Sequence, residues 1–233
     1  MRKDLLSGPG DRAVLEVGAT TYAVTGLGRI VQLVAKRVID LLCAAVLLTL
    51  LLPVLAAVAF LVWYSSPGPV FFRQARVGQN GRVFRMHRFR TMVHKAQPTL
   101  HQQYYSALVN SIAVPVQGTY KLANDRRITR IGRSLRRFSL DELPQLWDVI
   151  KGDMSLVGPR PGLAYEVELY GTRERVRLGA KPGLTGLWQV SGSALTFQEM
   201  IDLDVYYVEH WSIWLDIWIL LRTPLVLLAG RGV

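Results

Sequence analysis

Residues 38–64 read VIDLLCAAVLLTLLLPVLAAVAFLVWY, and this stretch decides which kinds of protein the chain can be. Apart from Asp40 near its start, the stretch has no charged side chain, and the next charge along the chain is Arg73. About 20 apolar residues are enough for a helix to cross a bilayer. The simplest interpretation is therefore a single transmembrane helix.

Two features favour a helical hairpin that enters a membrane and returns on the same side. Pro53 lies in the middle of the run, where a proline removes a backbone hydrogen bond and kinks a helix. Lys36 and Arg37 precede the run and Arg73 and Arg76 follow it, and basic flanks stay on the cytoplasmic side. The residues alone leave three interpretations open, which are the spanning helix, the hairpin and a buried helix of a soluble core.

The whole chain is both basic and apolar. Its 233 residues include 28 Lys and Arg against 17 Asp and Glu, and half of them are hydrophobic, which excludes intrinsic disorder. Cys43 is the only cysteine, so there is no intrachain disulfide framework. No acidic residue occurs between positions 41 and 124. We expect membrane lipids and a phosphate-rich ligand as partners, because nucleic-acid binding would explain the charge but not the apolar segments.

The downstream pattern predicts an α+β domain that is mostly helical. Residues 71–77 and 82–89 have the pattern of strands and flank Asn80-Gly81, a strong hairpin signal. Helical periodicity predicts helices over residues 126–138, 143–150, 164–178 and 197–209. The expected division is an N-terminal arm over 1–33, a re-entrant helical hairpin over 34–66 and a cytoplasmic domain over 67–233.

Two segments are typical of helices that lie on a membrane surface. In residues 126–138, an apolar stripe is opposed by arginines at positions 126, 130, 133 and 137. In residues 211–228, Trp211, Trp214 and Trp218 recur at helical spacing, and tryptophan favours the headgroup layer. We expect this C-terminal helix to lie in the interface, with a buried core helix as the alternative.

Asp141-Glu142 is the only pair of adjacent carboxylates in the chain. The ordinary interpretation is a helix start, with Ser139 as N-cap and Glu142 completing a capping box. The functional interpretation is that one carboxylate attacks phosphorus and the other helps to bind Mg²⁺, which takes one or two carboxylates together with phosphate oxygens.

The block Val157-Gly158-Pro159-Arg160-Pro161 holds one arginine between two prolines. Arg160 would then present its planar guanidinium to a phosphate with little flexibility, although the ordinary interpretation is a turn whose arginine faces solvent. The chain has no Walker A loop, no dinucleotide-binding glycine motif after a strand and no His-Glu-x-x-His motif.

Several long motifs together resemble one family. They are SLDELPQL (residues 139–146), KGDMSLVGPRP (151–161), KPGLTGLWQ (181–189), LDVYYV (203–208), RFRTM (88–92) and KRVID (36–40). In order and spacing this set closely resembles the bacterial sugar transferases, the monotopic phosphoglycosyl transferases, over residues 34–233. The resemblance implies a re-entrant first helix in the bacterial inner membrane, with the catalytic domain on the cytoplasmic face.

The resemblance also implies an activity and a set of site residues. Members transfer a sugar-1-phosphate from a UDP-sugar to undecaprenyl phosphate, at the first membrane step of exopolysaccharide, capsule or O-antigen synthesis. Asp141 matches the nucleophile, which forms a covalent phosphosugar intermediate and releases UMP, and Glu142 matches the residue that acts with Mg²⁺. The residues that match substrate-binding or site-integrity positions are Arg90, Arg136, Pro159, Arg160, Pro161 and Asp204. Self-association is left open.

The sequence departs from the family pattern at two places. The helix break reads Leu52-Pro53 rather than Ser-Pro, and Ser193 follows Ser191-Gly192 where the family usually has an arginine. The C-terminal segment resembles that of the larger members, and the short arm predicts that the chain is their catalytic core alone.

Two other hypotheses remain. One keeps the enzyme but binds both substrates together without a covalent step, and the other is a non-catalytic membrane scaffold that retains the fold. The missing arginine favours the scaffold, whereas the intact set of Asp141, Glu142, Arg136 and Arg160 favours the enzyme.

Overall fold

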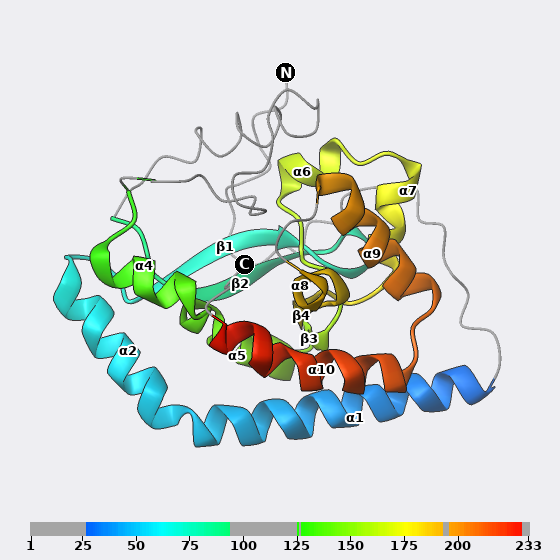
Figure 1. Ribbon diagram of the computed structural model, residues 1–233, viewed down its shortest axis with the longest axis horizontal. Helices are drawn as coiled ribbons and strands as arrows, with labels where there is room; N and C mark the ends of the chain where they lie inside the picture. The colour runs from blue at the N-terminus through cyan, green and yellow to red at the C-terminus, as the bar shows by residue number, and fades with distance from the viewer. Residues whose placement is uncertain (1–26, 94–124, 126, 193–195, 230–233) are drawn as a thin grey trace.

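The computed structural model describes residues 27–93, 125, 127–192 and 196–229 (Figure 1). Its helices and strands, in chain order, are α1 (Leu27–Leu50), α2 (Leu52–Ser65), β1 (Phe71–Val77), η1 (Gln79–Gly81), β2 (Val83–Phe89), α4 (Arg130–Arg137), η2 (Leu140–Glu142), α5 (Gln145–Lys151), β3 (Ser155–Val157), α6 (Ala164–Glu168), α7 (Thr172–Arg175), η3 (Val176–Gly179), β4 (Gly183–Thr185), α8 (Leu187–Ser191), α9 (Phe197–Glu209) and α10 (Ile213–Leu228). The expected class, mostly helical α+β with a β-hairpin, is confirmed.

Helices α1 and α2 form a bent pair along one side of the domain (Figure 1). They meet at Leu51 with a bend of 62°. Pro53 lies in the first turn of α2, where a backbone N–H would have no hydrogen-bond partner within the helix, so the N–H that proline lacks is not missed. The predicted break at Pro53 is therefore confirmed. Among the described helices none is by itself long and apolar enough to cross a bilayer, whereas the bent pair qualifies when its two halves are taken together.

The hairpin β1–β2 is antiparallel, with Phe71 opposite Phe89 and Val77 opposite Val83. Its turn contains Asn80 with a φ of 55°, the left-handed conformation that asparagine tolerates better than most residues. Because side chains alternate along a strand, Arg76 and Arg88 lie on the same face of the hairpin as Phe84 and Met86. That face turns toward the interior, since Phe84 and Met86 are both buried.

Strands β3 and β4 form a short parallel pair in the centre of the domain (Figure 1). A β-carbon on Gly158 would lie 2.3 Å from the carbonyl oxygen of Lys181, so the close approach of these two backbone segments requires glycine there. Leu156 and Val157 of β3 lie in the main core together with Met154, and this core also takes in Ile219 of α10. The loop that leaves β3 contains the Pro-Arg-Pro block, so the core fixes its position.

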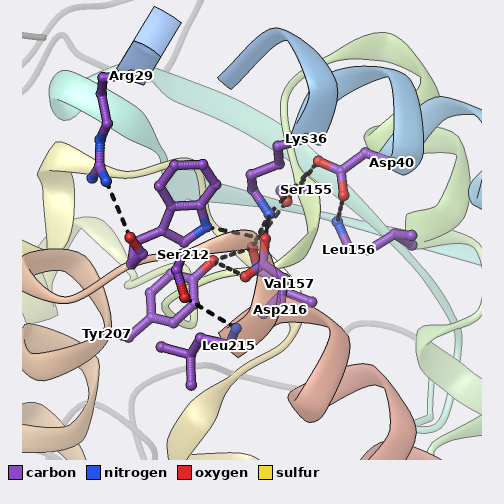
Figure 2. Close-up of polar contacts among 11 residues, drawn as sticks. Arg29, Lys36, Asp40, Ser155, Leu156, Val157, Tyr207, Ser212, Leu215 and Asp216 are labelled. Carbon is purple, nitrogen blue, oxygen red and sulfur yellow. Dashed lines mark hydrogen bonds and ion pairs between the residues drawn. The ribbon is translucent and has the colours of Figure 1, made fainter. Parts of the chain in front are cut away.

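Polar contacts join α1 to the domain (Figure 2). Asp40 is buried and accepts hydrogen bonds from the Ser155 hydroxyl (2.8 Å) and the Leu156 N–H (3.2 Å). The ammonium of Lys36 lies 2.6 Å from Asp216 of α10 and donates to the Val157 carbonyl. The membrane predictions did not foresee these contacts, which bind α1 to the domain core.

Arg37 and Trp211 also have structural roles that differ from their predicted membrane roles. Arg37 donates to the carbonyls of Val149 and Ile150 at the C-terminus of α5, where a cation complements the helix dipole. Trp211 precedes α10, and its buried indole donates to Asp216. The prediction that Trp211 lies at the lipid interface is therefore wrong, because its polar atom is needed inside the protein.

The remaining differences concern helix boundaries. Helix α1 begins at Leu27, inside the expected arm. The helix predicted over 126–138 starts at Arg130 because Thr129 caps it, and Arg126 lies outside the described residues. The helix predicted over 164–178 is divided into α6, α7 and η3. The helix expected over 143–150 is α5, and the one over 197–209 is confirmed as α9.

The bent pair and α10 expose large apolar side chains. They include Leu42, Leu50, Phe60 and Trp63 on α1 and α2, and Trp214, Leu221, Leu225 and Leu228 on α10, each at least 60% exposed. Soluble monomers rarely expose apolar patches of this kind, so this surface is suited to contact with lipid. Trp214 and Trp218 are among the exposed side chains of α10, and their position at a membrane interface stays a prediction.

Candidate active site

The two adjacent carboxylates lie in the single turn η2, between α4 and α5. Ser139 begins this turn with a φ of 53°, a conformation that is sparsely populated for serine, and its side chain makes no capping hydrogen bond. The capping-box interpretation is therefore wrong. Asp141 and Glu142 are both buried, with 3% and 8% of their surface exposed, and a buried carboxylate needs cationic or hydrogen-bonding partners.

Arg88 of β2 bridges the two carboxylates. Its guanidinium lies 3.6 Å from the Asp141 carboxylate and forms a short ion pair with Glu142. The neighbouring His87 fixes this strand against α5, because its N–H and its ring both contact the fully buried carboxylate of Asp148, at 2.8 and 2.7 Å. Arg88 is thus a rigidly placed cation at the centre of the site.

Two further arginines approach the carboxylates from other elements. The Arg136 side chain of α4 is fixed by a 2.9 Å hydrogen bond to the Thr91 hydroxyl. Burial lowers the pKa of Arg136, while the charge of Asp141 opposes this shift. Burial also lowers the pKa of Arg160; Arg88 lowers it further, and the charge of Glu142 acts in the opposite direction. The predicted Arg136 and Arg160 are therefore brought together with the carboxylates.

A small polar pocket opens beside Glu142. Arg76, Arg88 and Arg160 line it, together with Gln145 of α5 and Gln189 of α8. Among the described residues, Arg88 Nε, Gln145 Nε2 and Gln189 Oε1 are buried and have no hydrogen-bond partner. Buried polar atoms are nearly always satisfied in proteins, so these atoms are suited to bind a polar ligand. Three guanidinium groups suit a ligand with several phosphate oxygens.

The comparison with known proteins agrees with this geometry. A sequence model of the family described as "Bacterial sugar transferase" matches residues 31–230. The chain belongs to the bacterial sugar transferase family. Residues 31–230 include all of the bent helix pair except the first four residues of α1, together with the carboxylate turn and the Pro-Arg-Pro block, so the whole site lies within the matched region.

Similar members of this family come from several bacteria. The chain is 43% identical to galactosyl transferase CpsE of Streptococcus agalactiae over 203 residues. This aligned region covers 86% of this chain and 44% of that protein. It is 40% identical to the undecaprenyl-phosphate galactose phosphotransferase of Salmonella typhimurium over 203 residues. These aligned residues are 84% of this chain and 41% of that protein. The chain thus spans less than half the length of these two relatives.

A relative of similar size is the exopolysaccharide production protein ExoY of Rhizobium meliloti. It is 40% identical to this chain over 210 residues, which are 89% of this chain and 92% of that protein. This chain matches less than half of each of the two longer relatives, whereas it matches nearly the whole length of ExoY.

Within this sugar transferase, Asp204 acts on the Pro-Arg-Pro block through Arg177. Arg177 lies 2.6 Å from the Asp204 carboxylate and donates to the Arg160 carbonyl at 3.3 Å. Burial raises the pKa of Asp204 to about 6, while the charge of Arg177 opposes this shift. The structure indicates that Asp204 positions Arg160, whereas the prediction made it a substrate-binding residue.

The two prolines around Arg160 are fixed through their carbonyls. Pro161 accepts a hydrogen bond from the buried Arg76 at 3.0 Å, and Pro159 accepts one from the Gly183 N–H at 2.9 Å. The prediction that both prolines hold Arg160 is consistent with this arrangement. The hairpin and β4 thus fix the backbone on both sides of Arg160.

Arg90 differs from its predicted role at the substrate. It is buried, and its guanidinium donates to the carbonyls of Pro69 (2.7 Å), Ser66 (2.6 Å) and Val62 (3.3 Å). These carbonyls lie in and just after the last turn of α2, so Arg90 fixes α2 to the end of β2. Period-two alternation in residues 83–89 could have indicated Arg88 instead, because it shares a face with buried Phe84 and Met86.

Asp141 and Glu142 alone would supply only part of the coordination shell of a magnesium ion. Mg²⁺ is usually bound through one or two carboxylates and completes its shell with water and substrate phosphate oxygens. In the described part of the chain, no group of three or more His, Cys, Asp or Glu residues could hold a metal. Asp141 and Glu142 would therefore hold the ion together with a bound phosphate. Ser193, at the position where the resemblance leads us to expect an arginine, lies outside the described residues.

Proposed function

We propose that this protein transfers a sugar-1-phosphate from a UDP-sugar to undecaprenyl phosphate, at the cytoplasmic face of the bacterial inner membrane. The observation that carries this proposal is the buried Asp141–Glu142 pair with Arg88, Arg136 and Arg160 around it. The relatives support the substrates, since one is named for UDP-galactose and a lipid carrier and another for undecaprenyl phosphate and galactose.

The first step uses Asp141 as the nucleophile. A carboxylate oxygen of Asp141 bonds to the phosphorus that carries the sugar, and the bond from that phosphorus to the bridging oxygen breaks. UMP leaves with the bridging oxygen and its electron pair, and the sugar phosphate stays on Asp141 as an acyl phosphate. The guanidinium groups of Arg88 and Arg160 stabilise the negative charge that moves onto the oxygens during this step.

The second step returns the enzyme to its starting state. A phosphate oxygen of undecaprenyl phosphate bonds to the same phosphorus, and the bond to Asp141 breaks with its electrons returning to the carboxylate. The product is undecaprenyl-diphospho-sugar. Arg136 lies near Asp141, where its charge favours the released carboxylate.

Magnesium is the cofactor that this site would take, held by Asp141 and Glu142. When bound, the ion would neutralise diphosphate charge that two carboxylates would otherwise repel. Glu142 would keep the ion beside the reacting phosphate, and Arg88 would share its charge between the metal-binding and nucleophilic carboxylates.

Chelation therefore tests the function and the cofactor in one assay. We expect purified protein, given a UDP-sugar and undecaprenyl phosphate, to release UMP, and a panel of UDP-sugars to identify the donor. EDTA should abolish release and excess Mg²⁺ should restore it, because the carboxylates and the diphosphate repel each other without the ion. Undiminished UMP release after exhaustive chelation would refute the metal role, whereas no release with any donor would count against the transferase.

A covalent step distinguishes this mechanism from simultaneous binding of both substrates. If the phosphosugar resides on Asp141, labelled UMP exchanges into the donor without any acceptor. A mechanism that needs both substrates together does not permit this exchange.

The bent pair α1–α2 is proposed to be re-entrant, so both of its ends should face the cytoplasm. We expect cysteines introduced by Val34→Cys and Arg73→Cys, each with Cys43→Ala, to react with an impermeant maleimide in inside-out vesicles only. Both positions are exposed, and replacing Val34 rather than Lys36 preserves the contact with Asp216. Labelling of either cysteine in intact spheroplasts would refute the re-entrant pair and support the interpretation as a transmembrane helix.

A further inference from the structure

Asp148 of α5 is a fully buried carboxylate outside the carboxylate turn, with 0% of its surface exposed. Burial raises the pKa of its carboxyl group, whereas hydrogen bonds with His87 and the charge of Lys151 oppose this shift. The Lys151 side chain is 41% exposed and its ammonium lies 4.0 Å from the carboxylate, so His87 supplies the close contacts. Replacing a buried ion pair by apolar side chains is often neutral or stabilising, so stability alone does not account for an acid at this position.

The Asp148 carboxylate covers an edge of β2 that has no strand beside it. Among the described residues, β2 pairs with β1 alone, and Arg73 of β1 lies opposite His87. The His87 N–H is directed away from β1, because it donates to Asp148 at 2.8 Å. A backbone N–H at a sheet edge needs an acceptor, and one carboxylate oxygen takes the place of a third strand here. The other oxygen lies 2.7 Å from Nδ1 of the His87 ring, so Asp148 fixes both the main chain and the side chain of His87.

This contact joins the two elements that carry opposite charges of the site. Helix α5 follows shortly after η2, the turn that contains Asp141. Strand β2 carries Arg88, which is the residue after His87 and lies 3.6 Å from the Asp141 carboxylate. Successive side chains of a strand point to opposite faces, so α5 can hold His87 while Arg88 reaches the carboxylates. The distance between Arg88 and Asp141 therefore depends on how β2 is fixed to α5.

We propose that Asp148 is a positioning residue of the transferase reaction, which acts by holding β2 so that Arg88 meets the reacting phosphate. This inference rests on the proposed function, because it uses the role of Arg88 at the phosphorus that Asp141 attacks. A displacement of about 1 Å in a group that stabilises the transition state can lower the rate about 100-fold. The acceptor for the His87 N–H is the essential feature, so a side chain that keeps one acceptor oxygen should keep most of the effect.

Substitutions of the Asp148 side chain test this contact separately from the other bonds of the residue. The main-chain carbonyl of Asp148 accepts hydrogen bonds from the N–H groups of Asp153 and Met154, both at 3.1 Å, in the turn that leads to β3. These bonds do not use the side chain, so they remain in every variant. Asp148→Leu removes both acceptor oxygens, whereas Asp148→Asn keeps one of them.

First-turnover release of UMP without acceptor measures the effect, with UDP-galactose or UDP-glucose as donor, whichever reacts faster. Asp148→Leu should lower the rate about 100-fold and change the half-saturating donor concentration less than about three-fold, because Arg88 acts on charge that develops in the transition state. Asp148→Asn should stay within about five-fold of wild type, since its side-chain oxygen still accepts the His87 N–H. Asp202→Leu is the matched control, an exposed carboxylate of α9 whose loss should change the rate less than about two-fold.

A double-mutant cycle with Arg88→Gln separates positioning from a general loss of structure. If Asp148 acts through Arg88, Asp148→Leu should cost about 100-fold in the wild-type background but less than about three-fold in the Arg88→Gln background. A residue that only stabilises the fold would cost the same in both. Equal losses in the two backgrounds, or an unchanged rate in folded Asp148→Leu, would overturn the inference.

A second cycle with His87→Phe leaves α5 unaltered, so it decides the question if Asp148→Leu does not fold. The variant keeps the strand N–H and loses the ring contact, and it should cost about ten-fold in the wild-type background and less than about two-fold with Arg88→Gln. Equal losses here would also overturn the positioning role, while UMP release by the wild-type protein still supported the proposed function. No UMP release by wild type from any UDP-sugar would instead overturn the proposed function, and this inference with it.

Discussion

Asp141→Asn should reduce the rate of undecaprenyl-diphospho-sugar formation by about a thousand-fold or more, because the substitution removes the proposed nucleophile and with it the covalent reaction path. Asparagine has nearly the same shape as aspartate and still accepts hydrogen bonds, but its amide does not attack phosphorus at a useful rate. The change also weakens the contact with Arg88, which is a modest loss at 3.6 Å. The measurement is steady-state product formation with the identified donor.

Asp202→Asn is the control for that experiment. Asp202 lies on the exposed surface of α9, where its carboxylate pairs with Arg173 at 2.9 Å, away from the carboxylate turn. Turnover of this variant should match wild type within about two-fold, as for most surface substitutions. Retention of near-normal turnover by a folded Asp141→Asn protein would refute the nucleophile assignment.

Asp216→Ala should destabilise the protein by about 3–5 kcal/mol, the usual cost of leaving one partner of a buried ion pair alone. Asp216 is 7% exposed, and its carboxylate accepts hydrogen bonds from Lys36 (2.6 Å), the Tyr207 hydroxyl (2.7 Å) and the Trp211 indole (3.0 Å) (Figure 2). The substitution leaves the buried Tyr207 hydroxyl and Trp211 indole, and the partly buried Lys36 ammonium, with fewer partners. It also removes the polar contact that joins α1 to α10.

Thermal unfolding in detergent, followed by tryptophan fluorescence, measures this effect. The transition should fall by roughly 6–20 °C for the stated loss in a chain of this size. Asp202→Ala breaks an ion pair of similar length at the surface, where such pairs contribute about 0.2–1 kcal/mol. If the two variants lower the transition by similar amounts, the network around Asp216 does not hold α1 and α10 to the core.

The sequence was sufficient for features that depend on local pattern. Proline in the middle of residues 38–64 predicted the break between α1 and α2, and Asn80-Gly81 with flanking alternation predicted the hairpin. The capping residues Thr196 and Glu199 begin α9 where the periodicity predicted a helix. These features are set by backbone preferences of a few neighbouring residues.

Features that depend on distant partners were predicted less well. Lys36 and Arg37 have the pattern of a basic membrane flank, yet each binds a group more than 100 residues away in the sequence. Arg90 and Arg88 are two positions apart in one motif, and only the packing of the hairpin shows that Arg88 meets the carboxylates. The contacts of Lys36 and Arg37 depend on which distant segments pack against α1. Period-two alternation can place Arg88 on the inward face of its strand, but it does not say which residues Arg88 meets there.

Intact-mass analysis after rapid quenching with the true donor tests the central claim most directly. The account predicts one added sugar phosphate per chain in the absence of acceptor, located on Asp141 by peptide sequencing and removed when undecaprenyl phosphate is added. A protein that forms undecaprenyl-diphospho-sugar normally but never carries that added mass, at any quench time, would contradict the covalent mechanism.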